Sequence, residues 1–156
     1  MDRLHVTTPD ASDIEYIAAH LRSSDSDELR AVHGDNVDIL DVLTRAVAVS
    51  AEAMVATTPF GEPIALFGVA AASLMGGVAS PWLLGTDRLE QHGRELVAFA
   101  KRDVARWSLS YDRLVNFVDA RNTRSIQWLK RIGFQVFDAK PYGLQGLPFH
   151  EFELCT

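Results

Sequence analysis

The spacing of apolar residues predicts one strand and then three helices in the first third of the chain. Residues 4–8 (LHVTT) are apolar or β-branched, which favours a short strand. The next segment has Ile14, Ile17, Ala18 and Leu21 on one helical face, with Asp10 or Ser12 as its N-cap. Residues 23–34, which end on a glycine, and residues of about 36–49 are the second and third predicted helices.

The middle of the chain has the pattern of an antiparallel meander. Residues 51–59 and 62–71 are strand-like runs separated by a Pro/Gly turn, and residues 78–84 form a third run. Pro81 has no backbone N–H, so the strand that contains it lies at an edge, carries a bulge, or opens away from a neighbour.

The last third is predicted to add two helices and three strands. A long helix runs from Thr86 or Asp87 to about Trp107, and residues 113–119 form a strand parallel to the preceding one. A helix over 122–132 follows, with Ser125, Ile126, Leu129 and Ile132 facing inward, and Gly133 ends it. Residues 134–139 and 148–154 are two further strands joined by a loop at 140–146.

This order predicts an α/β (α+β) fold, in which helices flank a mixed sheet of about seven strands. The 156 residues contain no repeat and no linker, so we expect residues 1–156 to form a single domain.

Composition narrows the classes of function. The net charge of −6 argues against binding to nucleic acid, which requires clustered cations. The longest apolar run is too short to span a membrane, and the N-terminus lacks the features of a signal peptide, so we expect a cytoplasmic protein. A single cysteine, Cys155, allows neither an internal disulfide nor a thiolate metal cluster, and no metal site is predicted.

The segment DARNTRSIQWLKRIGF, residues 119–134, carries the strongest motif. Asn122, the small residue Ser125, and Gly133–Phe134 at the helix end resemble the pattern of the GCN5-related N-acetyltransferase (GNAT) superfamily. Together with PWLLGT at 81–86, the segment resembles the internal virion protein A-like acetyltransferase family of T7-type bacteriophages.

The resemblance implies a binding site for acetyl-CoA. In such enzymes the fourth and fifth strands splay apart, the pantetheine lies between them, and the pyrophosphate sits at the N-terminus of the following helix. By this resemblance Leu83, Leu84, Gly85 and Thr86 line the cofactor path, and Asn122 and Ser125 approach it from the other side. Asp87 and Glu90 lie in the first turn of the long helix, where Arg88 and His92 can offset their charge at a pyrophosphate.

Catalysis in this superfamily needs groups that transfer protons. Many members carry a tyrosine where this chain has Leu129, so Tyr142 in the predicted loop is the candidate acid. His33 and Asp119 are candidate bases, as are His92 and His150. Alternatively, His33 is a residue at a helix C-terminus, and Asp119 pairs with Arg121 or caps the next helix.

Two functions fit the sequence. The first is an N-acyltransferase that moves acetyl from acetyl-CoA to an amine. The second is a catalytically degenerate form of the fold that assists phage virion assembly or binds a phage or host protein. An open cavity between the fourth and fifth strands is the feature that the first function requires.

Overall fold

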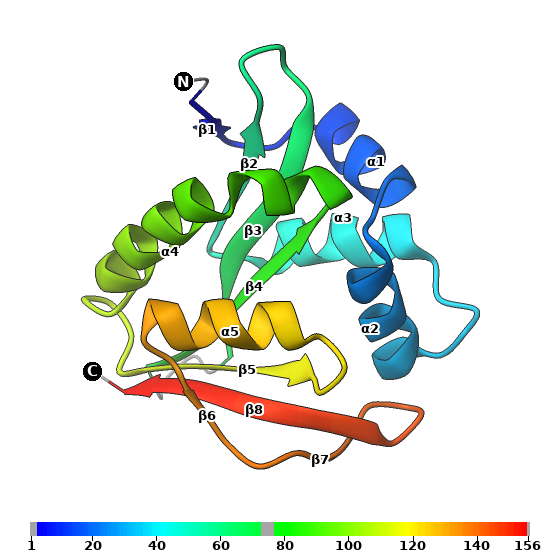
Figure 1. Ribbon diagram of the computed structural model, residues 1–156, viewed down its shortest axis with the longest axis vertical. Coiled ribbons are helices and arrows are strands. Elements are labelled where there is room, and N and C mark those ends of the chain that lie inside the picture. Colours follow the sequence, from blue (N-terminus) through cyan, green and yellow to red (C-terminus); the bar gives the residue numbers. More distant parts are fainter. Residues whose placement is uncertain (1–2, 73–76, 156) are drawn as a thin grey trace.

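The computed structural model describes residues 3–72 and 77–155, which form a twisted sheet with helices on both faces (Figure 1). The strands follow the order β1-β2-β3-β4-β5-β8-β6, with β7 also paired to β8. Their bounds are β1 His5–Thr7, β2 Glu52–Thr57, β3 Pro63–Ala71, β4 Val78–Gly85, β5 Arg113–Asp119, β6 Gln135–Val136, β7 Lys140–Tyr142 and β8 Leu147–Cys155. The predicted mixed sheet is confirmed, and the described residues form eight strands of it rather than about seven.

Capping residues set where the helices begin. Asp10 accepts a hydrogen bond from the backbone N–H of Asp13, and Asp38 accepts one from that of Asp41. Each cap satisfies a backbone N–H that has no partner inside its helix. The helices are α1 Ala11–Ala19, α2 Ser23–His33, α3 Ile39–Val49, α4 Gly93–Trp107 and α5 Thr123–Ile132, with a 3₁₀ turn at Asp87–His92. Among the residues that the structure describes, no helix is long and apolar enough to cross a membrane.

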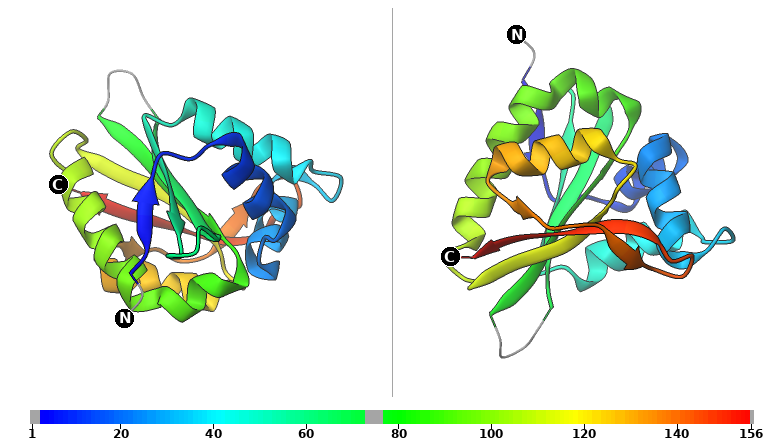
Figure 2. Two further views of the ribbon diagram at one scale, coloured as in Figure 1. Left: turned by 90° about the horizontal axis from the view of Figure 1, so that it is seen from above. Right: turned by 60° about the horizontal axis from the view of Figure 1, so that its bottom comes forward.

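Alternation along the strands separates the helices into two layers. Leu66 of β3 and Leu84 of β4 pack with α1, α2 and α3, whereas Phe67 and Leu83, their neighbours in sequence, pack toward α4 and α5. The view from above shows α3 and α4 on opposite sides of the strands (Figure 2).

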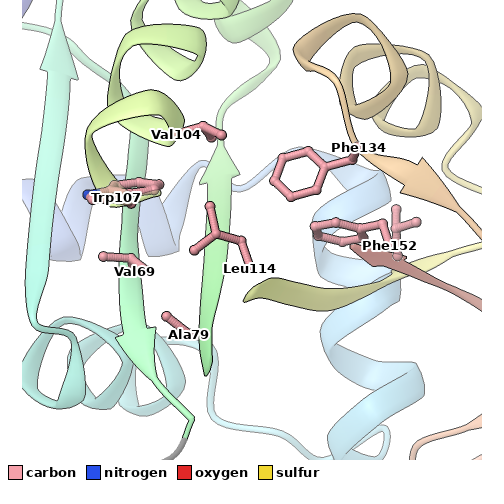
Figure 3. Packing of buried hydrophobic residues seen from close by; sticks show 8 residues of the cluster. Val69, Ala79, Val104, Trp107, Leu114, Phe134 and Phe152 are labelled. Atoms are coloured by element: carbon pink, nitrogen blue, oxygen red, sulfur yellow. The ribbon is translucent and has the colours of Figure 1, made fainter. Parts of the chain in front are cut away.

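The largest apolar cluster lies between the sheet and the C-terminal part of α4. Trp107 and Val104 of this helix share the cluster with Leu114 of β5 and Phe152 of β8 (Figure 3). Phe134 and Phe152 meet edge to face, with ring centroids 5.1 Å apart. This cluster fixes the ends of β4 and β5 at which the two strands meet.

Strands β4 and β5 are parallel but pair over only two residue positions. Val78 lies opposite Arg113 and Ala79 opposite Leu114, and beyond these the strands diverge (Figure 1). Pro81, which lacks an N–H, lies just past the last paired residue of β4. The expected opening between the fourth and fifth strands is therefore present.

The segment after β4 differs from its prediction. We expected one continuous helix from residue 86 or 87, but residues Asp87–His92 form a 3₁₀ turn and α4 begins at Gly93. Thr86 is held at the sheet, because its N–H donates to the carbonyl of Ile64, and the N–H of Leu89 then donates to the carbonyl of Thr86. This i to i+3 bond tightens the start of the segment.

The C-terminal hairpin also differs from its prediction. Strand pairing at residues 134–139 is limited to β6, and part of the predicted loop at 140–146 is strand β7, which pairs with β8. The remaining loop lies against α2: the N–H of Leu144 donates to the carbonyl of Val32. Gly143 has a φ of +77°, and a Cβ there would lie 2.8 Å from the Cα of Val32. This contact between distant segments left no periodic signal in the sequence.

Candidate functional site

The open wedge between β4 and β5 exposes backbone groups of Leu83. In an antiparallel ladder, alternate residues direct their N–H and C=O groups to the same side. The N–H and C=O of Gly85 bond to Asp25 and Arg22 of the N-terminal segment, away from β3. Leu83, two residues earlier, therefore also directs its N–H and C=O into the wedge.

Asn116 bridges the narrow end of the wedge. Its Nδ2 donates to the carbonyl of Pro81 across a distance of 2.9 Å, and its Oδ1 accepts from the N–H of Phe117. The side chain thus satisfies a β4 carbonyl that has lost its strand partner. It also sets how far a ligand can penetrate between the strands.

A buried ion pair bridges the wide end. Arg22 and Asp25 make two hydrogen bonds of 2.7 and 3.0 Å, and Arg22 Nη2 donates to Ser125 Oγ on α5. Asp25 also accepts from the N–H of Gly85, so the pair links β4 to α5. Burial raises the pKa of Asp25, against the opposing effect of the Arg22 guanidinium and the Gly85 N–H.

A cavity of about 340 Å³ begins at the wedge and reaches the helices on both sides of the sheet. Its walls include Leu83, Leu84, Asn122 and Ser125 of the predicted cofactor path. Residues of α2, α3, α4 and α5 contribute most of the remaining surface, which is largely apolar. The wedge is therefore not filled by side chains, and a ligand can occupy it.

Glu28 is a cavity side chain with unusual acidity, and it was not among the residues predicted from the sequence. Its Oε1 accepts the backbone N–H of Asp119 at 2.6 Å, at the end of β5. Burial raises the pKa of Glu28 to about 7, and the nearby carboxylates of Asp25 and Asp119 contribute to the shift. A carboxyl group with this pKa can accept or release a proton near neutral pH.

Asp119, a predicted base, lies outside this cavity and is held by Arg121. Its carboxylate accepts hydrogen bonds of 2.7 to 3.2 Å from the Arg121 guanidinium and one from the Arg121 N–H. Burial alone would raise the pKa of Asp119, but the Arg121 hydrogen bonds outweigh it, and the pKa lies below its ordinary value. The pairing with Arg121 is the alternative that the sequence left open.

His33 and Tyr142 both line the cavity, on its α2 side. His33 is exposed at the end of α2, whereas Tyr142 is half-buried. The Tyr142 ring stacks on Phe117 with centroids 4.0 Å apart and an interplanar angle of 11°. The two residues come from segments more than 100 positions apart, and the contact of the C-terminal loop with α2 brings them together.

Four residues of the predicted cofactor path lie outside the cavity wall. Arg88 pairs with Glu62 at 2.9 Å, and Thr86 is buried as the cap of the 3₁₀ turn. Gly85 is packed against Leu89, because a Cβ there would lie 2.3 Å from Leu89 Cδ1. His92 is the N-cap of α4, where its side chain makes no capping hydrogen bond.

Asn122 has a structural role that is visible without a ligand. It is buried, and its Oδ1 accepts from the N–H of Ser125 as the N-cap of α5. Trp128 on the same helix is half-buried and lies near Gly93 and under the Arg22 guanidinium. Helix α5 has no fully buried residue, although Leu129 and Ile132 face inward, because the cavity lies beneath them.

Several solved structures share this fold over nearly their whole length. An acetyltransferase of the GNAT family from Bacillus anthracis is 13% identical, with 99% of this chain and 98% of that chain covered and a TM-score of 0.71. A spermidine N-acetyltransferase from Vibrio cholerae, solved with CoA and spermine, is 11% identical, with 98% and 95% covered and a TM-score of 0.71. A GCN5-related N-acetyltransferase from Kribbella flavida is 16% identical, with 98% of each chain covered and a TM-score of 0.67.

Comparison of sequences alone gives no relative. No protein-family model matches the chain, and no curated protein matches it. The likeness is therefore one of three-dimensional structure. At such low sequence identities it establishes the fold alone. This chain has the fold of the GCN5-related N-acetyltransferases.

Proposed function

We propose that this protein is an N-acyltransferase that moves acetyl from acetyl-CoA to an amine. One observation carries the proposal: a single cavity joins the Leu83 backbone in the wedge to the carboxylate of Glu28. The Leu83 backbone can hold an extended acyl donor, and the Glu28 carboxylate can take a proton from the acceptor amine. Solved structures of the same fold include an enzyme with CoA and spermine bound.

The residues present fit acetyl-CoA in two places. The N–H and C=O of Leu83 can pair with an amide of an extended pantetheine arm, as a neighbouring strand would. The first backbone amides of α4 lack a side-chain cap, so they can receive an anionic pyrophosphate. Glu90, which would repel that anion, is paired with Arg124 at 3.3 Å.

Acetyl-CoA would supply a thioester carbon that an amine can attack. Glu28 takes one proton from the ammonium form of the acceptor, and the nitrogen then bonds to the acyl carbon as the carbon–sulfur bond breaks. The second proton passes from the nitrogen to the sulfur, which leaves as the thiol. Asp119 orients Glu28 through its backbone N–H, and we propose that His33 and Tyr142 assist proton transfer within the same cavity.

A degenerate fold that serves in virion assembly or binds a phage or host protein is the second candidate. The observation that favours it is the pair Arg22–Asp25, which already occupies the N–H and C=O of Gly85. A phage origin, and with it a place in the host cytoplasm or the virion, rests on the motifs at 81–86 and 119–134 alone.

Calorimetry with acetyl-CoA separates the two candidates. We expect binding by the wild-type protein and loss of binding in Leu129→Trp, because the larger side chain fills the cavity beneath α5. The matched control is Gln127→Trp, which places the same side chain on the exposed face of the same helix and should bind as the wild type does.

Two calorimetric outcomes would contradict the proposal. No heat of binding at millimolar acetyl-CoA, with the wild-type protein folded, would exclude the acyltransferase. Equal binding by Leu129→Trp and the wild type, with Leu129→Trp folded by circular dichroism, would mean that the cofactor lies elsewhere.

A further inference from the structure

Acidic side chains predominate in the walls of the cavity. Among the described residues, its walls contain three carboxylates and one histidine but no lysine or arginine. The first carboxylate, Asp25, accepts two hydrogen bonds from the Arg22 guanidinium. Asp103 lies on α4 and bonds to Arg106. Glu28 is therefore the carboxylate on the α2 side that no cationic side chain contacts directly.

The surface around Glu28 is apolar and partly flat. Leu29 and Val32 of α2 lie beside it along the helix, and Val42 and Ala46 of α3 line the same cavity. The stacked rings of Phe117 and Tyr142 form another part of the wall. Such a wall favours a hydrocarbon or aromatic group by burial of apolar surface.

We propose that the acceptor is a primary amine with one ammonium group and an apolar alkyl or arylalkyl tail. The ammonium pairs with Glu28, and the tail lies against the apolar residues of α2 and α3. This inference rests on the proposed acyltransferase function and specifies its acceptor.

An amino acid is a poor acceptor at this site. Its carboxylate would enter an apolar cavity beside Glu28, and the cationic side chain that reaches the wall, Arg22, is already paired with Asp25 and bonded to Ser125. A polyamine is also disfavoured, because the other carboxylate of the wall that could receive its second ammonium, Asp103, lies on α4 and already bonds to Arg106 through one oxygen. Beside Glu28 the second ammonium would meet the walls of Leu29, Val32 and Val42.

The first test is a comparison of acceptors in a thiol-release assay with acetyl-CoA. We expect kcat/KM for 2-phenylethylamine to exceed that for phenylalanine by about 100-fold or more, because only phenylalanine buries an unpaired carboxylate. The value for spermidine should also be lower than that for 2-phenylethylamine. Equal or greater activity with phenylalanine or spermidine would overturn the proposal.

A second test reverses the preference. Val42→Lys places a cation on the α3 wall, so it should raise the ratio of phenylalanine to 2-phenylethylamine activity by at least about 10-fold. The neutral control Val42→Gln should leave that ratio within about threefold of the wild-type ratio. An unchanged ratio in a folded Val42→Lys protein, as judged by its melting temperature, would contradict the proposed position of the acceptor.

Failure of this inference differs from failure of the acyltransferase proposal. If acetyl-CoA binds in calorimetry but another class of amine is preferred, only the acceptor inference is wrong. If acetyl-CoA does not bind, the acyltransferase proposal is wrong, and the acceptor inference falls with it.

Discussion

The environment of Glu28 determines the pKa of its carboxyl group. It lies in a helix where the sequence offers several acidic residues, and nothing in their spacing distinguishes one from the others. In the folded chain burial raises the pKa of Glu28 to about 7, and the nearby carboxylates of Asp25 and Asp119 add to the shift, whereas the hydrogen bond from the Asp119 N–H opposes it. The same environment that makes Glu28 a base also makes its ionisation costly to the fold.

The variant Glu28→Gln tests the role of Glu28 as a base and the cost of its ionisation to the fold. Gln keeps an oxygen for the Asp119 N–H, so the fold should persist while kcat/KM for acetyl transfer falls about 100-fold or more. In the wild type, kcat/KM should rise through about pH 7 as Glu28 loses its proton, and this rise should be absent in the variant. A parallel pH profile in both proteins would exclude Glu28 as the base.

The stability of the two proteins should differ with pH in a defined direction. The folded-state pKa of Glu28 lies above the value of 4.5 for the unfolded chain, so the folded protein holds the proton more tightly between these values. Wild-type stability should therefore fall as the pH rises from about 4.5 to about 7, by up to about 3 kcal/mol, and stay at that lower level above it. Chemical denaturation should show a smaller fall for Glu28→Gln.

At the scale of one element, helix α5 combines a local and a tertiary role. Asn122 caps its N-terminus and Gly133 ends it with a φ of +117°, where the N–H of Gly133 bonds to the carbonyls of Leu129 and Lys130. Both ends were predicted from the sequence because capping depends on a few adjacent residues. That the inward face lines a cavity rather than a filled core depends on β4, β5 and α4, which lie elsewhere in the chain.

The variant Gly133→Ala measures how much the left-handed conformation at the end of α5 contributes to stability. A Cβ at Gly133 would contact nothing within 4 Å, so the cost is conformational and should be about 1 kcal/mol of unfolding free energy. Gly93→Ala is the matched control, because its Cβ would lie 3.5 Å from the Trp128 ring in ordinary contact, with no positive φ. Equal losses in urea denaturation of the two variants would contradict the assigned role of the left-handed conformation.

At the scale of the whole molecule, the buried Arg22–Asp25 pair connects three parts of the fold. It joins the start of α2 to the end of β4 and to α5, and so spans the wide end of the wedge. The two residues are three apart in sequence, which would equally suit an exposed helical pair. Only the tertiary structure shows that both are buried.

Asp25→Ala should destabilise the protein by about 3–5 kcal/mol, because it leaves the Arg22 guanidinium buried without its carboxylate. The Gly85 N–H loses its acceptor in the same variant. Asp41→Ala, which removes the exposed partner of Arg45, should cost less than about 1 kcal/mol. Guanidinium denaturation of the two variants gives the comparison, and a loss at Asp25 as small as that at Asp41 would show that the buried pair adds nothing.

The sequence by itself determined the order of the helices and strands and most of their ends. Periodicity, caps and turn glycines act over a few residues, so they can be read along the chain. It also indicated the motif at residues 119–134 and the strand that contains Pro81, from which the opening between β4 and β5 was expected.

Only the tertiary structure decided which side chains share the cavity. Glu28, Leu83, Phe117 and Tyr142 come from four elements, and their proximity depends on how these elements pack. The strand β7 was missed for the same reason, since the loop beside it is held by α2. Burial and neighbouring charge set the pKa of Glu28, and neither exists until the chain is folded.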